Sequence, residues 1–369
     1  MELLLGIVIV VTCWMVVRII RSSKNQEGYK RWRAGNYASE NPYAKEKASG
    51  SLSQGFFSKR IRTSGARRFD DGAIRWCANL LAEESRLREV LDYIPRQYTC
   101  FHVRKRSGGF RYISAPAGDF RSMQQTIYHR ILLLANIHPA VTGFCPGKSV
   151  SDNARVHLGR KNVLKADLHD FFPSIRSPRV RAAFREMGYS RPIAKVLAEL
   201  CCLRCCLPQG APTSPALSNI IAYPMDKKMM ALAGEYGLVY TRYADDLTFS
   251  GDYLPKDEVL VRIHRIIREE GFTMNVKKTR FLSEHKRKII TGVSVSSGKK
   301  MTLPKVKKRE IRKNVHYVLT KGLVGHQEHI GSTDPVYLKR LLGSLCYWRS
   351  IEPDNRYVSD SITALKRLM

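Results

Sequence analysis

The sequence has few acidic residues. It contains 32 Asp and Glu against 63 Lys and Arg, which gives a formal net charge of +31 over 369 residues. This surplus exceeds what an ordinary solvated surface carries, and it indicates a polyanionic partner, either nucleic acid or an anionic membrane surface. Apolar residues still make up 44% of the chain. A chain of this length and composition can bury the cores of two or three packed subdomains.

The sequence also lacks a cysteine framework. Its nine cysteines are odd in number and do not follow the spacing of a small disulfide-rich secreted domain, which predicts a reduced, cytoplasmic protein. Four of them lie in the run Cys201-Cys202-Leu203-Arg204-Cys205-Cys206, but no second CxxC pair or nearby histidine completes a four-ligand zinc site. We interpret the run as a partly buried apolar segment rather than a zinc or redox site.

Charge is absent from residues 3–17, and residues 3–20 reach the roughly 17–25 residues of a membrane span if Arg18 extends to the interface. No basic segment precedes this stretch and no clear cleavage site follows it, which favours an uncleaved anchor at residues 1–21 over a signal peptide. The cations that follow predict a single-pass anchor at the cytoplasmic face of the inner membrane. The alternative is a buried or partner-binding helix in a cytoplasmic protein. Residues 22–69 are polar and basic and are interpreted as a linker that contacts lipid headgroups or RNA.

Two segments place carboxylates at the ends of apolar strands. Val163, Leu164 and Ala166 suit a buried strand that ends near Asp167, and residues 238–250 predict a β-hairpin with Asp245 and Asp246 at its tip. The alternative is that Asp167 caps a helix or forms a salt bridge, and that Asp245 and Asp246 lie in an ordinary solvated turn. However, adjacent carboxylates repel each other unless a cation lies between them.

The three aspartates fit two-metal phosphoryl transfer, in which carboxylates from neighbouring strands hold two divalent ions. We expect Asp167 and Asp245 to bridge two Mg²⁺ ions, with Mn²⁺ as an alternative metal. The backbone carbonyl of Leu168 adds a ligand, and Asp246 is the supporting acid.

Two further segments are candidates for nucleotide binding. Gln209 and Gly210 lie in a stiff loop between two prolines, where glycine lets the backbone approach a ligand. Residues 101–116 predict a basic hairpin with a Ser-Gly-Gly turn, which can fold its cations over a triphosphate. A solvated hairpin is the alternative.

Positive charge is concentrated near the C-terminus. Residues 277–313 hold fourteen Lys and Arg but only two acids. The segment from residue 305 predicts a helix with an apolar face formed by Ile311, Val315, Val318 and Leu319, while its cations track phosphates. The cations that we expect to contact RNA are Lys305, Lys308, Arg309 and Arg312. A further packed helix is expected at residues 336–350.

Taken in order, FHVRKRSGGFR, ADLHDFF, LPQGAPTSP, YADD and GFTMNVKKT resemble the motifs of reverse transcriptases and span residues 100–282. Two further elements resemble those of retron-type bacterial reverse transcriptases. The first is the NAxxH element, represented here by Asn153 and His157. The second is a VTG element, which reads Ile290-Thr291-Gly292 here, with Ile in place of Val.

This resemblance implies an α+β right-hand polymerase with fingers, an antiparallel palm sheet and a thumb, in addition to the N-terminal transmembrane helix. The expected divisions are the anchor 1–21, the linker 22–69, fingers and palm 70–298, and the thumb or RNA-binding region 299–369.

The resemblance also implies roles for individual residues. Phe172 would be the steric gate against a ribose 2′-OH, with Asp170 and Phe171 beside it. Lys105 and Arg111 would grip the triphosphate, with Arg104 and Arg106 as alternatives to Lys105. Lys278 would neutralise or protonate the pyrophosphate. Asn153 and His157 lie four residues apart on one helix face, and the family suggests RNA or structural contacts for them.

The function implied is the copying of a cognate noncoding RNA, which serves as template and primer, into single-stranded DNA with dNTPs. Priming from a guanosine 2′-OH would give the branched RNA–DNA hybrid (msDNA). No RNase H acid set follows the thumb, so a host RNase H is an expected partner. A separate effector protein that acts in antiphage defence is also an expected partner, as is a membrane that holds residues 3–20.

Three alternatives remain open from the sequence. A group II intron-like reverse transcriptase would be expected to continue into a maturase domain beyond residue 369. A non-catalytic, membrane-tethered RNA-binding protein would not need the three aspartates. The third alternative is a membrane-disrupting effector in which the polymerase fold serves only as a sensor.

Overall fold

The computed structural model describes residues 69–105 and 108–369. The chain divides into two units, of which one comprises Met1–Arg68 and Phe101–Arg104 and the other Phe69–Cys100 and Lys105–Met369. The predicted anchor and nearly all of the predicted linker lie outside the described residues, so both stay predictions. Among the helices that the structure describes, none is long and apolar enough to cross a membrane.

A four-stranded antiparallel sheet forms the centre of the second unit. Its strands are β3 (Asn162–Asp167), β4 (Val239–Tyr243), β5 (Asp246–Gly251) and β6 (Arg280–Leu282), in the spatial order β4-β5-β3-β6. The strand predicted from Val163, Leu164 and Ala166 is confirmed as β3, and all three side chains are buried. The hairpin predicted at residues 238–250 is confirmed as β4 and β5.

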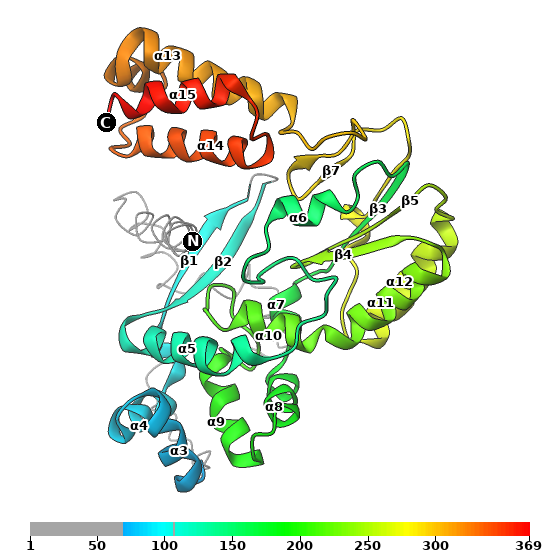
Figure 1. The fold of residues 1–369 in the computed structure, drawn as a ribbon. Coiled ribbons are helices and arrows are strands. Elements are labelled where there is room, and N and C mark those ends of the chain that lie inside the picture. The colour runs from blue at the N-terminus through cyan, green and yellow to red at the C-terminus, as the bar shows by residue number, and fades with distance from the viewer. Residues whose placement is uncertain (1–68, 106–107) are drawn as a thin grey trace, which may run out of the picture. The chain divides into compact units, whose positions relative to one another are not determined.

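Helices α11 (Tyr223–Glu235) and α12 (Lys256–Glu269) run side by side along this sheet (Figure 1). The sequence of α12 explains its packing, because Val259, Ile263 and Ile267 recur every four residues and form one buried stripe. Helix α10 (Ser214–Ile221) leads into α11. Ser214 is the first residue of α10, and its hydroxyl donates to the Pro208 carbonyl at 2.7 Å.

The remaining elements before the thumb are mainly helical. Helix α3 starts after Asp70, whose carboxylate accepts a hydrogen bond from the Ala73 amide at 2.8 Å, as expected of an N-cap. Strands β1 and β2 form a two-stranded sheet, which confirms the predicted basic hairpin. These elements are α3 (Asp71–Leu81), α4 (Glu84–Asp92), η1 (Ile94–Gln97), β1 (Tyr98–Arg104), β2 (Phe110–Pro116), α5 (Gly118–Arg130), η2 (Leu132–Leu134), α8 (Ser177–Glu186) and α9 (Arg191–Cys201).

The cysteine run follows α9 and agrees with the interpretation as a partly buried segment. Cys201 and Cys202 belong to the main hydrophobic core, whereas Cys205 is exposed. Burial raises the pKa of the Cys201 thiol to about 12, so it stays protonated and is a poor metal ligand.

Three helices form the bundle at the C-terminal end: α13 (Lys305–His329), α14 (Tyr337–Ile351) and α15 (Arg356–Lys366) (Figure 1). A short hairpin of β7 (Ile289–Ile290) and β8 (Val293–Ser294) precedes them. The helix expected at 336–350 is confirmed as α14. Ile311, Val315 and Val318 are buried as predicted, but Leu319 is 45% exposed, so including it in the apolar face was wrong.

The buried core of this bundle extends to the central sheet. Ala154 and Val163 belong to the same buried cluster as Val315, Leu345 and Trp348 of the bundle. The side-chain packing is therefore continuous across the expected boundary between residues 298 and 299.

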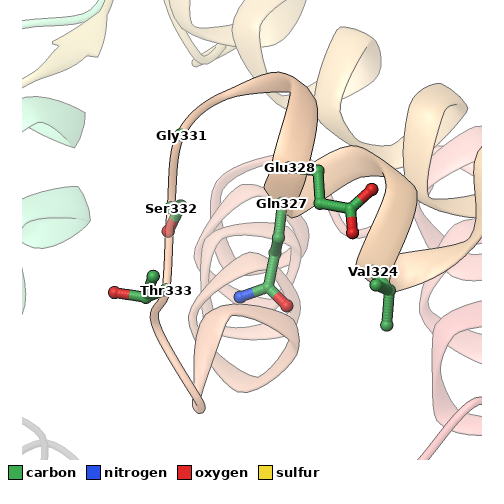
Figure 2. Close-up of a pocket in the computed structure, with 6 residues that line it drawn as sticks. All are labelled: Val324, Gln327, Glu328, Gly331, Ser332 and Thr333. Carbon is green, nitrogen blue, oxygen red and sulfur yellow. The ribbon is translucent and has the colours of Figure 1, made fainter.

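Figure 2 shows a pocket of about 360 Å³ where α13 ends and its following loop turns back. It is lined by Val324, Gln327, Glu328 and the loop residues 331–333. Gln327 closes the loop, since its side-chain amide donates to the Asp334 carbonyl at 2.6 Å. The pocket has one acid and no cation in its lining, which makes it unlike the carboxylate site that the sequence predicts.

Candidate active site

The sheet brings the three predicted aspartates together. Asp167, the last residue of β3, lies directly opposite Asp246, the first residue of β5. Opposed residues in an antiparallel pair have Cβ atoms about 4.5–5.5 Å apart and point to the same face. Asp245 precedes Asp246, and its carbonyl accepts a hydrogen bond from the Leu168 amide at 2.9 Å. The predicted meeting of acids from two strands is therefore observed, while their metal-binding role stays a prediction.

The hairpin turn between β4 and β5 has two residues, Ala244 and Asp245. Ala244 has φ +57°, which is uncommon for a residue other than glycine. The Ala244 carbonyl accepts a hydrogen bond from Arg242, and Gly143 packs against the Ala244 amide nitrogen, so the turn is held in this conformation.

The aspartates carry more negative charge than the surrounding protein neutralises. Burial, together with the charges of Asp246 and Asp167, raises the pKa of Asp245 to about 6. Burial also raises the pKa of Asp246. Lys278 lies in η3 (Val276–Lys278), just before β6, and its Nζ lies 3.0 Å from both carboxylate oxygens of Asp167.

Such a carboxylate set fits a divalent cation, because hard oxygen ligands are what Mg²⁺ prefers and a cation would relieve the repulsion. The described part of the chain contains no group of three or more His, Cys, Asp or Glu side chains already arranged as a metal site. The donor chemistry therefore suits the metal, but the carboxylates do not form a ready-made cage.

The segment after Asp167 turns sharply into α7 (Phe171–Ser174), with Asp170 exposed at φ +46°. Phe171 is buried, 5.6 Å from the Phe272 ring and 5.7 Å below the Arg242 guanidinium. Its predicted place beside the nucleotide sugar stays a prediction. Phe172 is half-buried and faces Phe144 at a ring-centroid distance of 6.0 Å.

Gly210 is required by a close backbone approach, although the neighbour is not a ligand. Its φ is +124°, and an added Cβ would lie 2.9 Å from Ile113 Cγ2 and from the Ser114 carbonyl oxygen, both on β2. The Ser114 amide donates to the Gln209 carbonyl at 2.8 Å. The loop is thus joined to the predicted fingers hairpin, while the contact of Gln209 and Gly210 with a nucleotide stays a prediction.

Lys105 and Arg111 are exposed on either side of the hairpin turn. The Lys105 amide donates to the Gly109 carbonyl at 2.9 Å, which closes the turn. Triphosphate binding by these cations stays a prediction.

Asn153 is buried on α6 (Val150–Arg155), where it links two other segments. Its Oδ1 accepts from the Thr142 hydroxyl at 2.8 Å, and its Nδ2 donates to Thr291 Oγ1 at 3.3 Å. The two elements that suggested the retron subgroup, at residues 153–157 and 290–292, are therefore in direct contact.

His157 is completely buried against the β4–β5 hairpin. Its Nδ1 lies 2.7 Å from Ser250 Oγ on β5, and its Nε2 lies 2.7 Å from Thr241 Oγ1 on β4. Burial lowers the pKa of His157 to about 3, so the ring is neutral near pH 7. Burial leaves Asn153 and His157 no surface with which to contact RNA in this structure, which corrects that assignment in favour of structural contacts.

Sequence reasoning missed a buried network on the other side of the hairpin. The Arg242 Nε and Nη2 atoms donate to the two Asp226 carboxylate oxygens at 2.8 and 2.7 Å. Its Nη1 donates to Asn219 Oδ1 at 3.0 Å and to the Ala244 carbonyl at 3.1 Å. Arg242 thus holds the peptide immediately before Asp245. The signal in the sequence was an arginine inside an otherwise apolar strand.

Gly143 was also missed, and it touches the hairpin turn from outside. An added Cβ would lie 2.6 Å from the Ala244 amide nitrogen. The Gly143 carbonyl accepts from Asn219 Nδ2 at 2.9 Å, and the neighbouring Thr142 amide donates to the Arg242 carbonyl at 2.9 Å. No spacing in the sequence indicates this approach, because residues 143 and 244 lie far apart along the chain.

The cations expected to contact RNA differ in their surroundings. Lys308 pairs with Glu352 at 2.7 Å, and Arg312 lies 5.0 Å from the Tyr357 ring centroid. Lys305 and Arg309 are exposed on α13. RNA binding by all four stays a prediction.

Comparison with known proteins gives a consistent result. The family model described as reverse transcriptase (RNA-dependent DNA polymerase) matches residues 103–317. The retron Mx65 reverse transcriptase of Myxococcus xanthus is 36% identical over 70% of this chain, and the match spans 62% of that relative's length. The retron Ec86 reverse transcriptase of Escherichia coli is 35% identical over 66% of this chain and 77% of the relative.

Among solved structures, a telomerase from Candida albicans in complex with a telomeric RNA fragment has a TM-score of 0.39 and 11% identity. The match covers 73% of this chain and 63% of that one. At this score and identity the similarity supports no conclusion.

Proposed function

Because the chain belongs to the reverse transcriptase family and resembles its retron members, we propose that it synthesises DNA on an RNA template by two-metal nucleotidyl transfer. The observation that carries this proposal is the direct opposition of Asp167 and Asp246, with Asp245 beside them, in a buried and incompletely neutralised group.

Asp167, Asp245 and Asp246, with the Leu168 carbonyl, would hold two Mg²⁺ ions or, alternatively, Mn²⁺. These ions supply activation of the attacking hydroxyl and neutralisation of the departing pyrophosphate. The protein's own contribution is to hold the carboxylates in place through the paired strands and the Leu168–Asp245 hydrogen bond. Lys278, which contacts Asp167 and remains largely exposed, is placed to neutralise the phosphates of a bound dNTP.

The substrates and partners follow from the retron relatives. The template and primer would be a cognate noncoding RNA, and the product a single-stranded DNA joined to it through a 2′-OH branch. Exposed cations of α13 would contact RNA phosphates. A host RNase H, a separate effector protein and a role in antiphage defence belong to the same proposal.

The decisive experiment is primer extension on an RNA template with Asp245→Asn. This substitution keeps the side-chain shape but removes a metal-binding charge, so we expect a loss of about a thousandfold or more in the rate of dNTP incorporation. RNA binding, measured by filter retention, should be unchanged.

Asp257→Asn is the matched control, because that carboxylate is exposed at the start of α12. It should leave incorporation unchanged. If Asp245→Asn extended the primer at the wild-type rate, the proposed function would be wrong.

We further propose that residues 3–20 anchor the enzyme in the inner membrane. Deleting residues 1–21 should move the protein from the membrane fraction to the soluble fraction while preserving primer extension. A full-length protein found entirely in the soluble fraction would contradict the anchor.

A further inference from the structure

Phe144 adopts a backbone conformation that its side chain does not favour. Its φ is +61°, a region that bulky residues rarely occupy. The ring is also 39% exposed, so burial of the side chain does not explain why this residue occupies the position. Strained residues of this kind persist only where the surrounding structure holds them, and they are frequent at ligand-binding sites.

The hairpin of β4 and β5 holds Phe144 in this conformation. Gly143, the preceding residue, lies against the Tyr243–Ala244 peptide so closely that a Cβ would not fit. Its carbonyl is bound by the buried Asn219 amide at 2.9 Å. The position of Phe144 is therefore tied to that of the turn that carries Asp245.

The Phe144 ring lies between two aromatic rings of the active site. Its centroid is 6.0 Å from that of Phe172 and 6.4 Å from that of Tyr243. Phe172 lies five residues after Asp167, and Tyr243 lies two residues before Asp245. Three uncharged rings, which we term the aromatic triad (Phe144, Phe172 and Tyr243), thus gather beside the aspartates.

A nucleotide has two chemically different parts. Its phosphates require cations, whereas its sugar and base present flat or apolar surfaces that pack on aromatic rings. The aspartates and Lys278 supply the charged side of this site, and the aromatic triad offers the apolar side.

We propose that Phe144 contacts the nucleoside of the incoming dNTP and, together with Phe172, narrows the space around its sugar. Phe144 is then a specificity-determining residue for nucleotide selection. This inference rests on the proposed polymerase function.

The backbone conformation suggests a substitution that separates binding from folding. Glycine adopts φ +61° without strain, so Phe144→Gly removes the ring while relieving the backbone. Its thermal unfolding temperature should equal or exceed that of the wild type. The KM for dNTP should rise about tenfold, the effect of losing one aromatic stacking contact. Discrimination against ribonucleotides should fall, and kcat should change less than KM.

Three further variants complete the design. Phe144→Tyr keeps the ring and should restore the wild-type KM, whereas Phe144→Leu keeps apolar bulk without a ring face and should fall between wild type and glycine. Tyr253→Ala removes a 76% exposed aromatic just after β5 and should change neither quantity.

Two results would overturn the proposal. One is an unfolding temperature of Phe144→Gly clearly below that of the wild type, which would show that the ring serves packing. The other is an unchanged KM and unchanged sugar discrimination in both Phe144→Gly and Phe144→Leu. A wild-type protein that makes no DNA would instead refute the polymerase function itself, so the two failures are distinguishable.

Discussion

Acids lie on both sides of the β4–β5 hairpin, and their charges are compensated to different degrees. On one side, Asp226 is fully buried and receives two hydrogen bonds from Arg242 and one from the Tyr240 hydroxyl. On the other side, Asp245 and Asp246 lie close together with raised pKa values, and Lys278 pairs with Asp167. The buried Asp226 therefore has a complete counter-charge in Arg242. The aspartates at the hairpin turn have only Lys278 beside Asp167, and this is where a cation from solution would bind.

The buried pair shows how strong this compensation is. Burial acts to lower the pKa of the Arg242 guanidinium, but the charge of Asp226 and its hydrogen bonds outweigh burial and raise it. The Arg242 guanidinium therefore stays charged in the folded state, and it depends on its buried partner. Removing one partner leaves the other charge buried without compensation.

The largest expected effect on stability comes from Asp226→Asn. It should lower the free energy of unfolding by about 3–5 kcal/mol, because the Arg242 charge stays buried after its partner is neutralised. Asp245→Asn should leave the free energy of unfolding unchanged or raise it, since it removes like-charge repulsion. Urea denaturation followed by circular dichroism measures both.

If both substitutions destabilised the protein equally, the contrast between the two sides would be lost. A loss below about 1 kcal/mol for Asp226→Asn, the range of an exposed ion pair, would also contradict it.

Gly143→Ala tests the contact that joins the hairpin turn to the Phe144 segment. The added methyl would lie 2.6 Å from the Ala244 nitrogen, so the turn or the segment must shift. Overpacking of this kind costs about 1–3 kcal/mol, and we expect the rate of dNTP incorporation to fall more than RNA binding does. Gly234→Ala in α11 is the matched control, because an added Cβ there meets open space. Equal effects of the two substitutions would show that the close approach has no influence on the site.

Local patterns in the sequence were sufficient for the elements that carry the aspartates. Apolar residues at 163, 164 and 166 and the β-branched and aromatic run up to Ala244 identified β3, β4 and the turn. The pattern of four-residue spacing also identified the buried face of α13, apart from Leu319.

The partners of buried polar groups could not be predicted in this way. Arg242 and Asp226 lie on a strand and a helix, and nothing in their spacing indicates that they pair. Asn153 lies on α6, but this helix ends at Arg155, so the prediction that Asn153 and His157 share one helix face was wrong. Which neighbours the two side chains meet depends on how the β4–β5 hairpin packs against this segment. For the same reason the close approach of Gly210 to β2 could not be predicted.

The smallest effect that we predict concerns His157, a buried group that has no counter-charge. His157 bridges Thr241 and Ser250 without a charge partner, and burial lowers its pKa to about 3 in the folded state. The unfolded chain has an ordinary histidine pKa of about 6.5. Between these values the unfolded state binds a proton that the folded state does not, so stability must fall as pH falls from about 6.5.

His157 alone should contribute a slope of about 1.4 kcal/mol per pH unit within this window. Other histidines titrate in the same range, so the quantity to measure is the difference between the wild type and His157→Gln, which stays polar but does not titrate. The free energy of unfolding should depend less steeply on pH between 6 and 4.5 in the variant. Parallel pH profiles would mean that His157 can be protonated in place, and that its buried position tolerates an uncompensated charge.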